Sequence, residues 1–118
     1  MYDIKIGHVH GPRLVGMTYV YCGRPMKDLA GSPLANPFNM FRDESKRNDV
    51  CDRFEAWMAQ QVRAEKNAGT IGPVRAELRR IHTLAQQGPV TLLCWCAPKR
   101  CHCESIRALV MSAERQLR

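Results

Sequence analysis

A short apolar segment followed by a turn and an amphipathic helix restricts the fold of this chain more than any other feature. The segment, residues 90–96, reads Val-Thr-Leu-Leu-Cys-Trp-Cys and directly follows Pro89. It is too short for a typical helix and has the composition of a strand that is buried on both faces. A turn at Pro98 follows, and apolar residues then recur at helical spacing at Ile106, Leu109, Val110, Ala113 and Leu117. This order of elements predicts a domain of the α/β class.

Two more strands are expected in the N-terminal part of the chain. Residues 2–6 alternate between apolar and polar side chains and stop at Gly7, which is typical of a half-buried strand. Residues 17–22 are rich in β-branched and aromatic side chains and stop at Gly23. The next segment, residues 24–40, contains three prolines and is expected to form a loop.

Two helices are expected between this loop and the buried strand. The first has Asp43 as its candidate N-cap and ends near Gly69. Its apolar stripe consists of Val50, Phe54, Trp57, Met58 and Val62. The second helix begins at Pro73, a favourable residue for a first helical turn, and ends at Gly88.

The length of 118 residues leaves room for one compact domain, residues 1–118. The hydrophobic fraction of 45% and the charged fraction of 25% are those of an ordinary globular protein, which excludes the collagen-like and disordered classes. We therefore expect a single small α/β domain whose sheet is flanked by helices. A Rossmann-like strand-loop-helix unit is expected around the cysteines and the histidine near the C-terminus.

The charge balance and the cysteine content bear on partners and location. A formal net charge of +7 favours anionic partners such as nucleic acid or nucleotides. The first residues form no signal peptide and no run approaches the length of a membrane span, so a cytoplasmic location without a membrane partner is expected. Thiols stay reduced there, so clustered cysteines point to metal binding, catalysis or burial rather than to disulfides.

Four cysteines and a histidine lie within the ten residues 94–103. Three thiolates and one imidazole, from Cys94, Cys96, Cys101 and His102, could satisfy tetrahedral zinc, as could four thiolates if Cys103 replaces the histidine. On a strand, Cys94 and Cys96 would present their sulfurs on the same face. The alternative is that the cysteines of this buried strand are small core residues without chemistry.

The same cluster also predicts a reactive thiol. Cys101 lies just before the expected C-terminal helix and is flanked by Lys99, Arg100 and His102. The helix dipole and these cations would stabilise a thiolate or hold a phosphate group.

The loop at residues 23–38 is the second candidate site. It follows a strand, carries Arg24, Ser32 and Asn36, and is stiffened by prolines, as a preorganised binding loop would be. A turn-rich connection without function is the alternative. A third feature is the row Arg75, Arg79 and Arg80, which could attract nucleic acid or could be a solvated helix face.

Three motifs in these segments resemble those of a known family. They are Tyr21-Cys22-Gly23-Arg24, Gly31-Ser32-Pro33-Leu34-Ala35-Asn36-Pro37-Phe38, and Cys94-Trp95-Cys96-Ala97-Pro98 followed by Cys101-His102. With them the chain resembles an uncharacterised family of small bacterial and phage proteins, domain of unknown function 4326. The resemblance implies one shared site containing Arg24, Ser32, Asn36, Cys96, Cys101 and His102, and it implies no particular activity. The family pattern has glycine at the position of Cys103 and an aliphatic residue at that of Cys22, so Cys103 is placed outside the site and Cys22 in the core.

Together these features predict an enzyme or binding protein for a phosphorylated, nucleotide-like molecule or a nucleic-acid base. The loops 23–38 and 96–102 are expected to meet at the C-terminal edge of the sheet, where Gly23, Arg24, Ser32, Asn36, Cys96 and Arg100 would bind the ligand and its phosphate. Cys101 would be a nucleophile or metal ligand, and His102 its general base or acid. The alternative is a zinc-stabilised module that binds nucleic acid or a regulatory protein partner.

Overall fold

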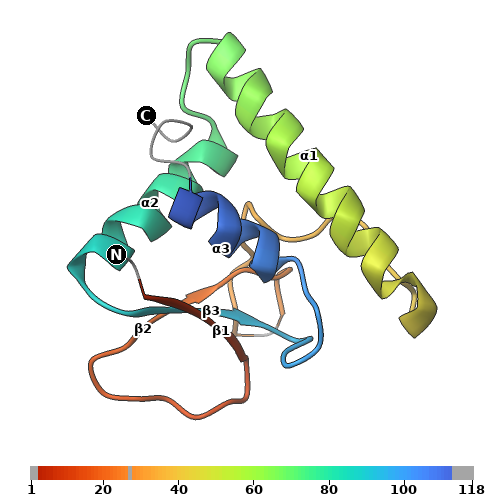
Figure 1. Cartoon of the computed structure of the whole chain (residues 1–118), viewed down its shortest axis with the longest axis vertical. Helices are drawn as coiled ribbons and strands as arrows, with labels where there is room; N and C mark the ends of the chain where they lie inside the picture. The colour runs from red at the N-terminus through yellow and green to blue at the C-terminus, as the bar shows by residue number, and fades with distance from the viewer. Residues whose placement is uncertain (1–2, 27, 113–118) are drawn as a thin grey trace.

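The computed structural model describes residues 3–26 and 28–112 as a three-stranded sheet with helices (Figure 1). The elements in chain order are β1 (Ile4–His8), β2 (Thr18–Tyr21), a 3-10 turn η1 (Glu44–Lys46), α1 (Arg47–Asn67), α2 (Pro73–Gln87), β3 (Val90–Cys94) and α3 (Cys103–Ser112). This arrangement confirms the predicted small α/β domain. No helix in the described ranges is both long enough and apolar enough to cross a membrane.

The sheet is entirely parallel and has the order β1-β3-β2. The middle strand β3 is buried along its whole length, which accounts for its continuous apolar sequence. His8 pairs with Cys94 and Tyr21 pairs with Leu93, so the carboxyl ends of all three strands reach the same edge. In open α/β sheets this edge is the usual place for a ligand.

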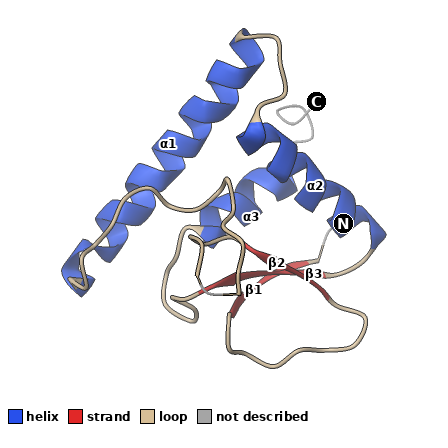
Figure 2. Ribbon diagram, turned by 180° about the vertical axis from the view of Figure 1, so that it is seen from behind, coloured by secondary structure: helices blue, strands red, loops and turns tan. Residues whose placement is uncertain are grey.

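The helices lie on one side of the sheet, and the connection between β1 and β2 extends on the other (Figures 1 and 2). The hydrophobic core lies between the two layers. The sheet contributes Ile4, Val20, Val90 and Leu92, and the helices contribute Phe54, Met58, Leu78, Ile81, Ile106 and Val110. Leu34 from the long loop is also completely buried in this core, so the loop is packed against the domain.

Local signals in the sequence place the helices. The carboxylate of Asp43 accepts a hydrogen bond from the Ser45 amide, so the predicted N-cap is confirmed, although the first turn is a 3-10 turn and α1 starts at Arg47. The helix α2 begins at Pro73 and ends before Gly88, as predicted.

Several predicted strand boundaries are wrong, and β2 is one residue shorter at each end than the predicted range 17–22. The first strand continues through Gly7 to His8, while Tyr2 lies outside the described residues. The last strand ends at Cys94 rather than at Cys96, because its pairing with β1 and β2 stops there and the chain turns. Cys94 and Cys96 therefore do not share a strand face. At the C-terminus, Ala113 and Leu117 of the predicted helix lie outside the described residues.

Candidate functional site

A pocket of about 280 Å³ opens at the carboxyl edge of the sheet. Its size is at the lower end of the range for small-molecule sites. Two loops line it, and α1 closes it from the side. The lining residues are Tyr21, Gly23, Arg24, Met26, Asn36, Phe38, Asn39, Met40, Arg47, Val50, Cys51, Cys94, Trp95, Cys96, Arg100, Cys101 and His102. The predicted meeting of the loops 23–38 and 96–102 is thus confirmed.

Arg24 carries a positive charge into this pocket. Its guanidinium donates to the carbonyl oxygen of Asn36 at 2.9 and 3.2 Å and to that of Phe38 at 3.1 Å. These partners are neutral, and none of the ion pairs found among the described residues involves Arg24. The charge of this exposed side chain is therefore not balanced by a carboxylate.

The polar residues of the 23–38 loop hold its shape. Asn36 donates from Nδ2 to the carbonyl of Val50 on α1 at 3.2 Å and accepts the Phe38 amide on Oδ1 at 2.8 Å. Ser32 accepts the amide of Leu34 on its hydroxyl and is not among the pocket-lining residues. Gly23 is buried, and a Cβ at its position would collide with the ring of Tyr21.

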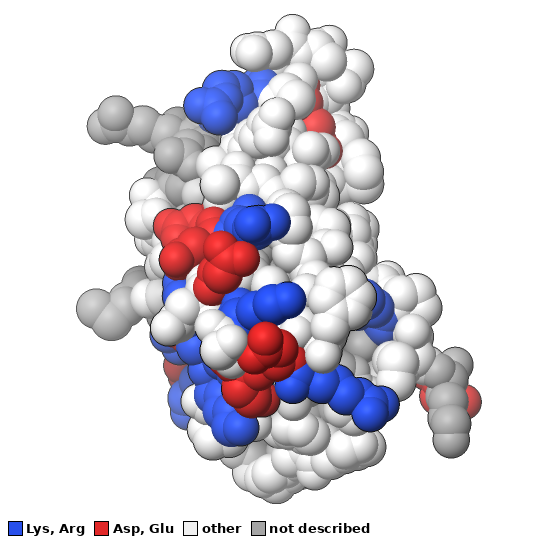
Figure 3. Space-filling model, turned by 90° about the vertical axis from the view of Figure 1, so that its right-hand side faces the viewer, with Lys and Arg blue, Asp and Glu red and all other residues white. Residues whose placement is uncertain are grey.

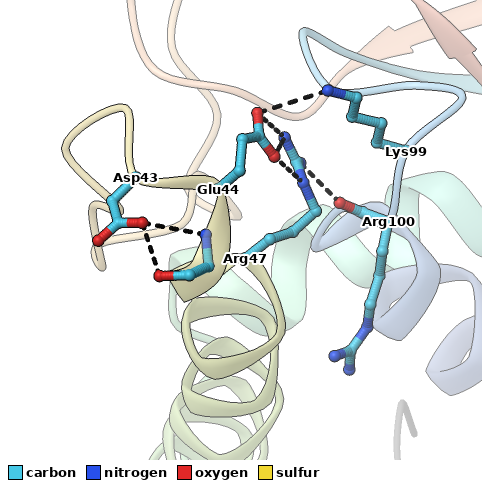
Figure 4. Close-up of polar contacts among 6 residues, drawn as sticks. Asp43, Glu44, Arg47, Lys99 and Arg100 are labelled. Carbon is cyan, nitrogen blue, oxygen red and sulfur yellow. Dashed lines mark hydrogen bonds and ion pairs between the residues drawn. The ribbon is translucent and has the colours of Figure 1, made fainter.

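The second loop is fastened to α1 by charged side chains (Figure 4). Arg47 donates to the carbonyl oxygen of Arg100 at 2.9 Å and pairs with Glu44 at 2.7 Å. Lys99 reaches the same Glu44 carboxylate at 3.6 Å. The Arg47 guanidinium also lies beside the Cys96 side chain, so it is close to both ends of the loop 96–100.

Arg100, predicted to bind phosphate, points back to α1. Its guanidinium pairs with the carboxylate of Asp52 at 2.8 Å and donates to the Asn48 side chain at 3.0 Å. Both Arg47 and Arg100 are thus paired with carboxylates, in contrast to Arg24.

Aromatic side chains form part of the pocket wall. The indole Nε1 of Trp95 donates to the hydroxyl of Tyr21 at 2.9 Å, and that hydroxyl donates to the carbonyl of Arg24 at 2.6 Å. Trp95 is 41% exposed, and Phe38 belongs to the opposite loop. Flat apolar surfaces are therefore present beside the unbalanced charge of Arg24.

Three cysteine sulfurs form a buried cluster at the base of the pocket. The Sγ atoms of Cys94, Cys101 and Cys103 all lie within 4.8 Å of one another, and Cys94 and Cys101 are 3.0 Å apart. The side chains come from the end of β3, from the loop and from the first residue of α3. Zinc with bonds of about 2.3 Å to tetrahedral sulfurs keeps those sulfurs about 3.8 Å apart. The cluster could therefore hold a metal ion.

The surroundings of Cys94 favour its thiolate form. Hydrogen bonds from the Cys101 and Cys103 thiols, helped by the amides of Ala97 and Cys96, lower the pKa of Cys94 to about 2 against the effect of burial. For Cys101, a hydrogen bond with Cys103 lowers the pKa, but the neighbouring Cys94 and burial outweigh it and raise the pKa to about 12. The cluster thus favours a negative charge on the Cys94 sulfur, next to thiols that donate to it. A metal bound there would displace the protons of these thiols.

The sulfur cluster differs from the zinc ligands predicted from the sequence. Cys94 and Cys101 belong to it, but Cys96 and His102 do not. Cys96 lies on the pocket wall because the strand ends before it, and the His102 ring is directed to the Cys22 carbonyl oxygen, 2.6 Å away. Cys103, placed outside the site by its departure from the family pattern, instead supplies the third sulfur.

The predicted nucleophile and base are both buried. Cys101 is 3% exposed and His102 is 8% exposed, although both contribute to the pocket lining. Among the hydrogen bonds of the described residues, none joins the two side chains. The accessible thiol of the site is that of Cys96, which is half-buried and contacts Arg47.

Sequence reasoning did not assign several residues of the site, among them Trp95, Phe38, Cys51 and Arg47, and it considered Cys103 only as a replacement for His102. Cys103 precedes Ile106 and Val110 by three and seven positions, so its place on the apolar stripe of the last helix indicates that it points inward. Cys51 has the same relation to Phe54 and Met58 in α1. Arg47 carries no such signal, because only the packing of α1 against the loop gives it its role.

The basic surface expected on α2 is not continuous. Arg75 is 6% exposed and donates to the carbonyl of Thr70, and Arg80 pairs with Glu77 at 2.6 Å. The side of the molecule that carries α1, shown in Figure 3, likewise has acidic and basic side chains interspersed. The structure therefore favours the interpretation of the arginine row as part of a mixed surface.

Comparison with known proteins gives one family. The chain matches the family described as Domain of unknown function (DUF4326) over residues 8–112, a range that includes both loops of the pocket and the sulfur cluster. No curated protein and no solved structure gives a significant match. Because the match spans most of the chain, the protein belongs to the DUF4326 family.

Proposed function

We propose that the pocket binds a phosphorylated, nucleotide-like molecule or the base of a nucleic acid. The observation that carries this proposal is the combination, in one pocket, of aromatic walls with a cation that no carboxylate balances. The base would lie against Trp95 and Phe38, and Arg24 would attract the phosphate.

The charge distribution supports Arg24 as the phosphate-binding residue. Arg47 and Arg100 are already paired with Glu44 and Asp52. Arg24 is exposed, and its partners are carbonyl oxygens, so its charge attracts an anion without first breaking an ion pair. In this proposal Asn36 and Ser32 keep the loop in the shape that presents Arg24.

Calorimetric titration with nucleoside monophosphates and short oligonucleotides tests the proposal. We expect Arg24→Gln to weaken phosphate-dependent binding by tenfold or more, since a charge-assisted hydrogen bond contributes about 1.5–3 kcal/mol. Arg80→Gln removes an exposed arginine from α2 and serves as the matched control. Binding that is equal in both variants, or no binding to the parent protein, would refute the proposal.

The aromatic wall is tested separately with Trp95→Ala. Stacking on an aromatic side chain contributes about 1–3 kcal/mol per base, so affinity should fall by about fivefold or more. Phe41→Ala is the control, because Phe41 is 76% exposed and does not line the pocket. Inorganic phosphate should bind Trp95→Ala as it binds the parent protein.

We also propose that the cluster of three buried sulfurs binds a metal ion and that this ion is zinc. Zinc prefers thiolates and a tetrahedral arrangement, and the cytoplasmic location that we propose would keep the sulfurs reduced. Metal analysis of protein purified without chelator should find about one zinc per chain. A metal-free protein whose thiols all react as freely as those of the unfolded chain would contradict this assignment.

A further inference from the structure

We propose that the metal held by Cys94, Cys101 and Cys103 has an open fourth position that faces the pocket and takes an exchangeable ligand. This inference rests on the proposal that the sulfur cluster holds a metal. It extends that proposal because a structural zinc site is normally closed by four protein ligands, whereas a site with three protein ligands takes water or a ligand molecule as the fourth.

The number of converging sulfurs supports an open position. In the described part of the chain, the cluster contains three ligand atoms within 4.8 Å of one another and no fourth His, Cys, Asp or Glu side chain. The three sulfurs are already gathered by the end of β3, the loop and the start of α3. A metal could bind them with little rearrangement of the backbone.

The direction of the opening follows from which cysteines reach the pocket. Cys94 and Cys101 are among the pocket-lining residues, while Cys103 is 0% exposed and does not line the pocket. The sulfur of Cys103 thus lies on the core side of the cluster. A fourth ligand would come from the pocket side, where the cavity has room for it.

Cys22 is one protein side chain that could close the site as a fourth metal ligand. Its thiol is close enough to Cys103 to form a hydrogen bond, and it raises the pKa of Cys103 together with Cys101 and Cys94. However, the Cys22 sulfur is not within 4.8 Å of all three cluster sulfurs. It is directed to the Val20 carbonyl at 3.7 Å, on its own strand.

Cys96 and His102 are the other side chains that could serve as a fourth metal ligand. The Cys96 thiol contacts the Arg47 guanidinium on the pocket wall, and Nε2 of His102 donates to the Cys22 carbonyl. Either side chain would have to exchange these partners before it could bind the metal. The charge also favours a neutral fourth ligand, because three thiolates already leave a divalent metal with a net charge of −1 in a buried site.

The ligand chemistry follows from the metal and the pocket. Zinc in such a site accepts water or the nitrogen of an aromatic heterocycle, and the aromatic wall beside Trp95 suits a flat ring. The open position would therefore hold water until a heterocyclic nitrogen displaces it. The base that we propose as the ligand of the pocket would therefore contact the metal directly through this nitrogen.

Cobalt(II) substitution tests the inference in the folded protein. The thiolate-to-cobalt and d–d absorption bands report the number of sulfurs and the fourth ligand. We expect one cobalt per chain and d–d bands that shift on titration with imidazole. Cys22→Ser and Cys96→Ser should each bind cobalt within about threefold of the parent protein, whereas Cys103→Ser should lose about a hundredfold or more in affinity.

The outcomes of the cobalt experiment distinguish three claims: the open fourth position, metal binding by the cluster and nucleotide binding by the pocket. Loss of cobalt in Cys22→Ser or Cys96→Ser, with circular dichroism showing a folded variant, would overturn the open position in favour of a closed site. Cobalt bands that imidazole leaves unchanged would overturn it as well. No cobalt binding at all would refute the metal proposal itself.

If imidazole shifts the bands but no nucleotide binds in calorimetry, the open position stands and the nucleotide proposal fails. The Cys22→Ser, Cys96→Ser double variant avoids dependence on Cys103→Ser, since it should fold, bind cobalt and respond to imidazole.

Discussion

The imidazole Nε2 of His102 lies 2.6 Å from the carbonyl oxygen of Cys22, a residue 80 positions earlier in the chain. Because a carbonyl can only accept, Nε2 carries the proton in this contact. The ring also packs edge-on against Phe54, with the centroids 4.9 Å apart. His102 therefore connects the start of α3 to the end of β2 and to α1, rather than turning toward the sulfurs beside it.

This position of His102 predicts a loss of stability in acid. Burial lowers the pKa of His102, against the opposing effect of the hydrogen bond to Cys22. As the pH falls below about 6.5, the unfolded chain binds a proton that the folded protein does not, so the free energy of unfolding decreases. Urea unfolding of the metal-free, reduced protein between pH 7.5 and pH 5 should show this decrease, and His102→Gln should reduce it. Exposed His10→Gln is the control and should keep the slope of the parent protein.

A second prediction concerns the thiols. Among the six cysteines, Cys96 alone is half-buried, and the other five are buried. Iodoacetamide added to the native, metal-free protein should therefore modify Cys96 first, and peptide mass spectrometry would locate the label. In Cys96→Ser, labelling should slow to the rate at which the domain opens. Faster labelling of Cys101 would support the reactive thiol predicted from the sequence instead.

The elements of the fold could be predicted because their signals are local. Apolar periodicity, the Asp43 cap and Pro73 fix the two long helices, and the apolar run from Val90 marks the central strand. The order of the strands could not be predicted, since it depends on how residues far apart in the sequence pair.

The membership of the sulfur cluster was harder to predict because it depends on one strand boundary. Extending β3 by two residues placed Cys96 beside Cys94 on the same face. In the structure the chain turns after Cys94, so Cys96 reaches the pocket wall. Cys103 points inward because it begins the buried stripe of α3, a signal that outweighs its departure from the family pattern.

A third prediction tests whether Asn36 shapes the binding loop. Its side chain is hydrogen-bonded to the Val50 carbonyl on α1 and to the Phe38 amide, so Asn36→Ala removes the link between the loop and α1 and leaves the Phe38 amide without this partner. We expect a loss of about 1–3 kcal/mol in the free energy of unfolding, measured with urea. Asn39→Ala removes a similar bond to the Phe41 amide in an exposed turn and should cost less. Equal costs in the two variants would contradict a special role for Asn36.

The last prediction concerns Glu65 in α1, which caps the N-terminus of α2. Its carboxylate accepts the amides of Val74 at 3.1 Å and Arg75 at 2.9 Å, while Gly72, the N-cap residue itself, has no side chain to do so. Glu65→Ala should therefore cost about 0.5–2 kcal/mol in the free energy of unfolding. Glu55→Ala, an exposed change in the same helix, should cost less than about 0.5 kcal/mol.

A substitution at Gly72 tests the same cap of α2 by a second route. Its φ of −81° suits any residue, but a Cβ there would overlap the Glu65 carboxylate. Gly72→Ala should thus destabilise the parent protein because it displaces the cap. In the Glu65→Ala background the overlap is gone, and replacing glycine restricts the unfolded chain, so the same change should be neutral or stabilising by up to about 1 kcal/mol. A double-mutant cycle measured by urea unfolding would detect this change of sign, and additive costs would show that the carboxylate does not cap α2.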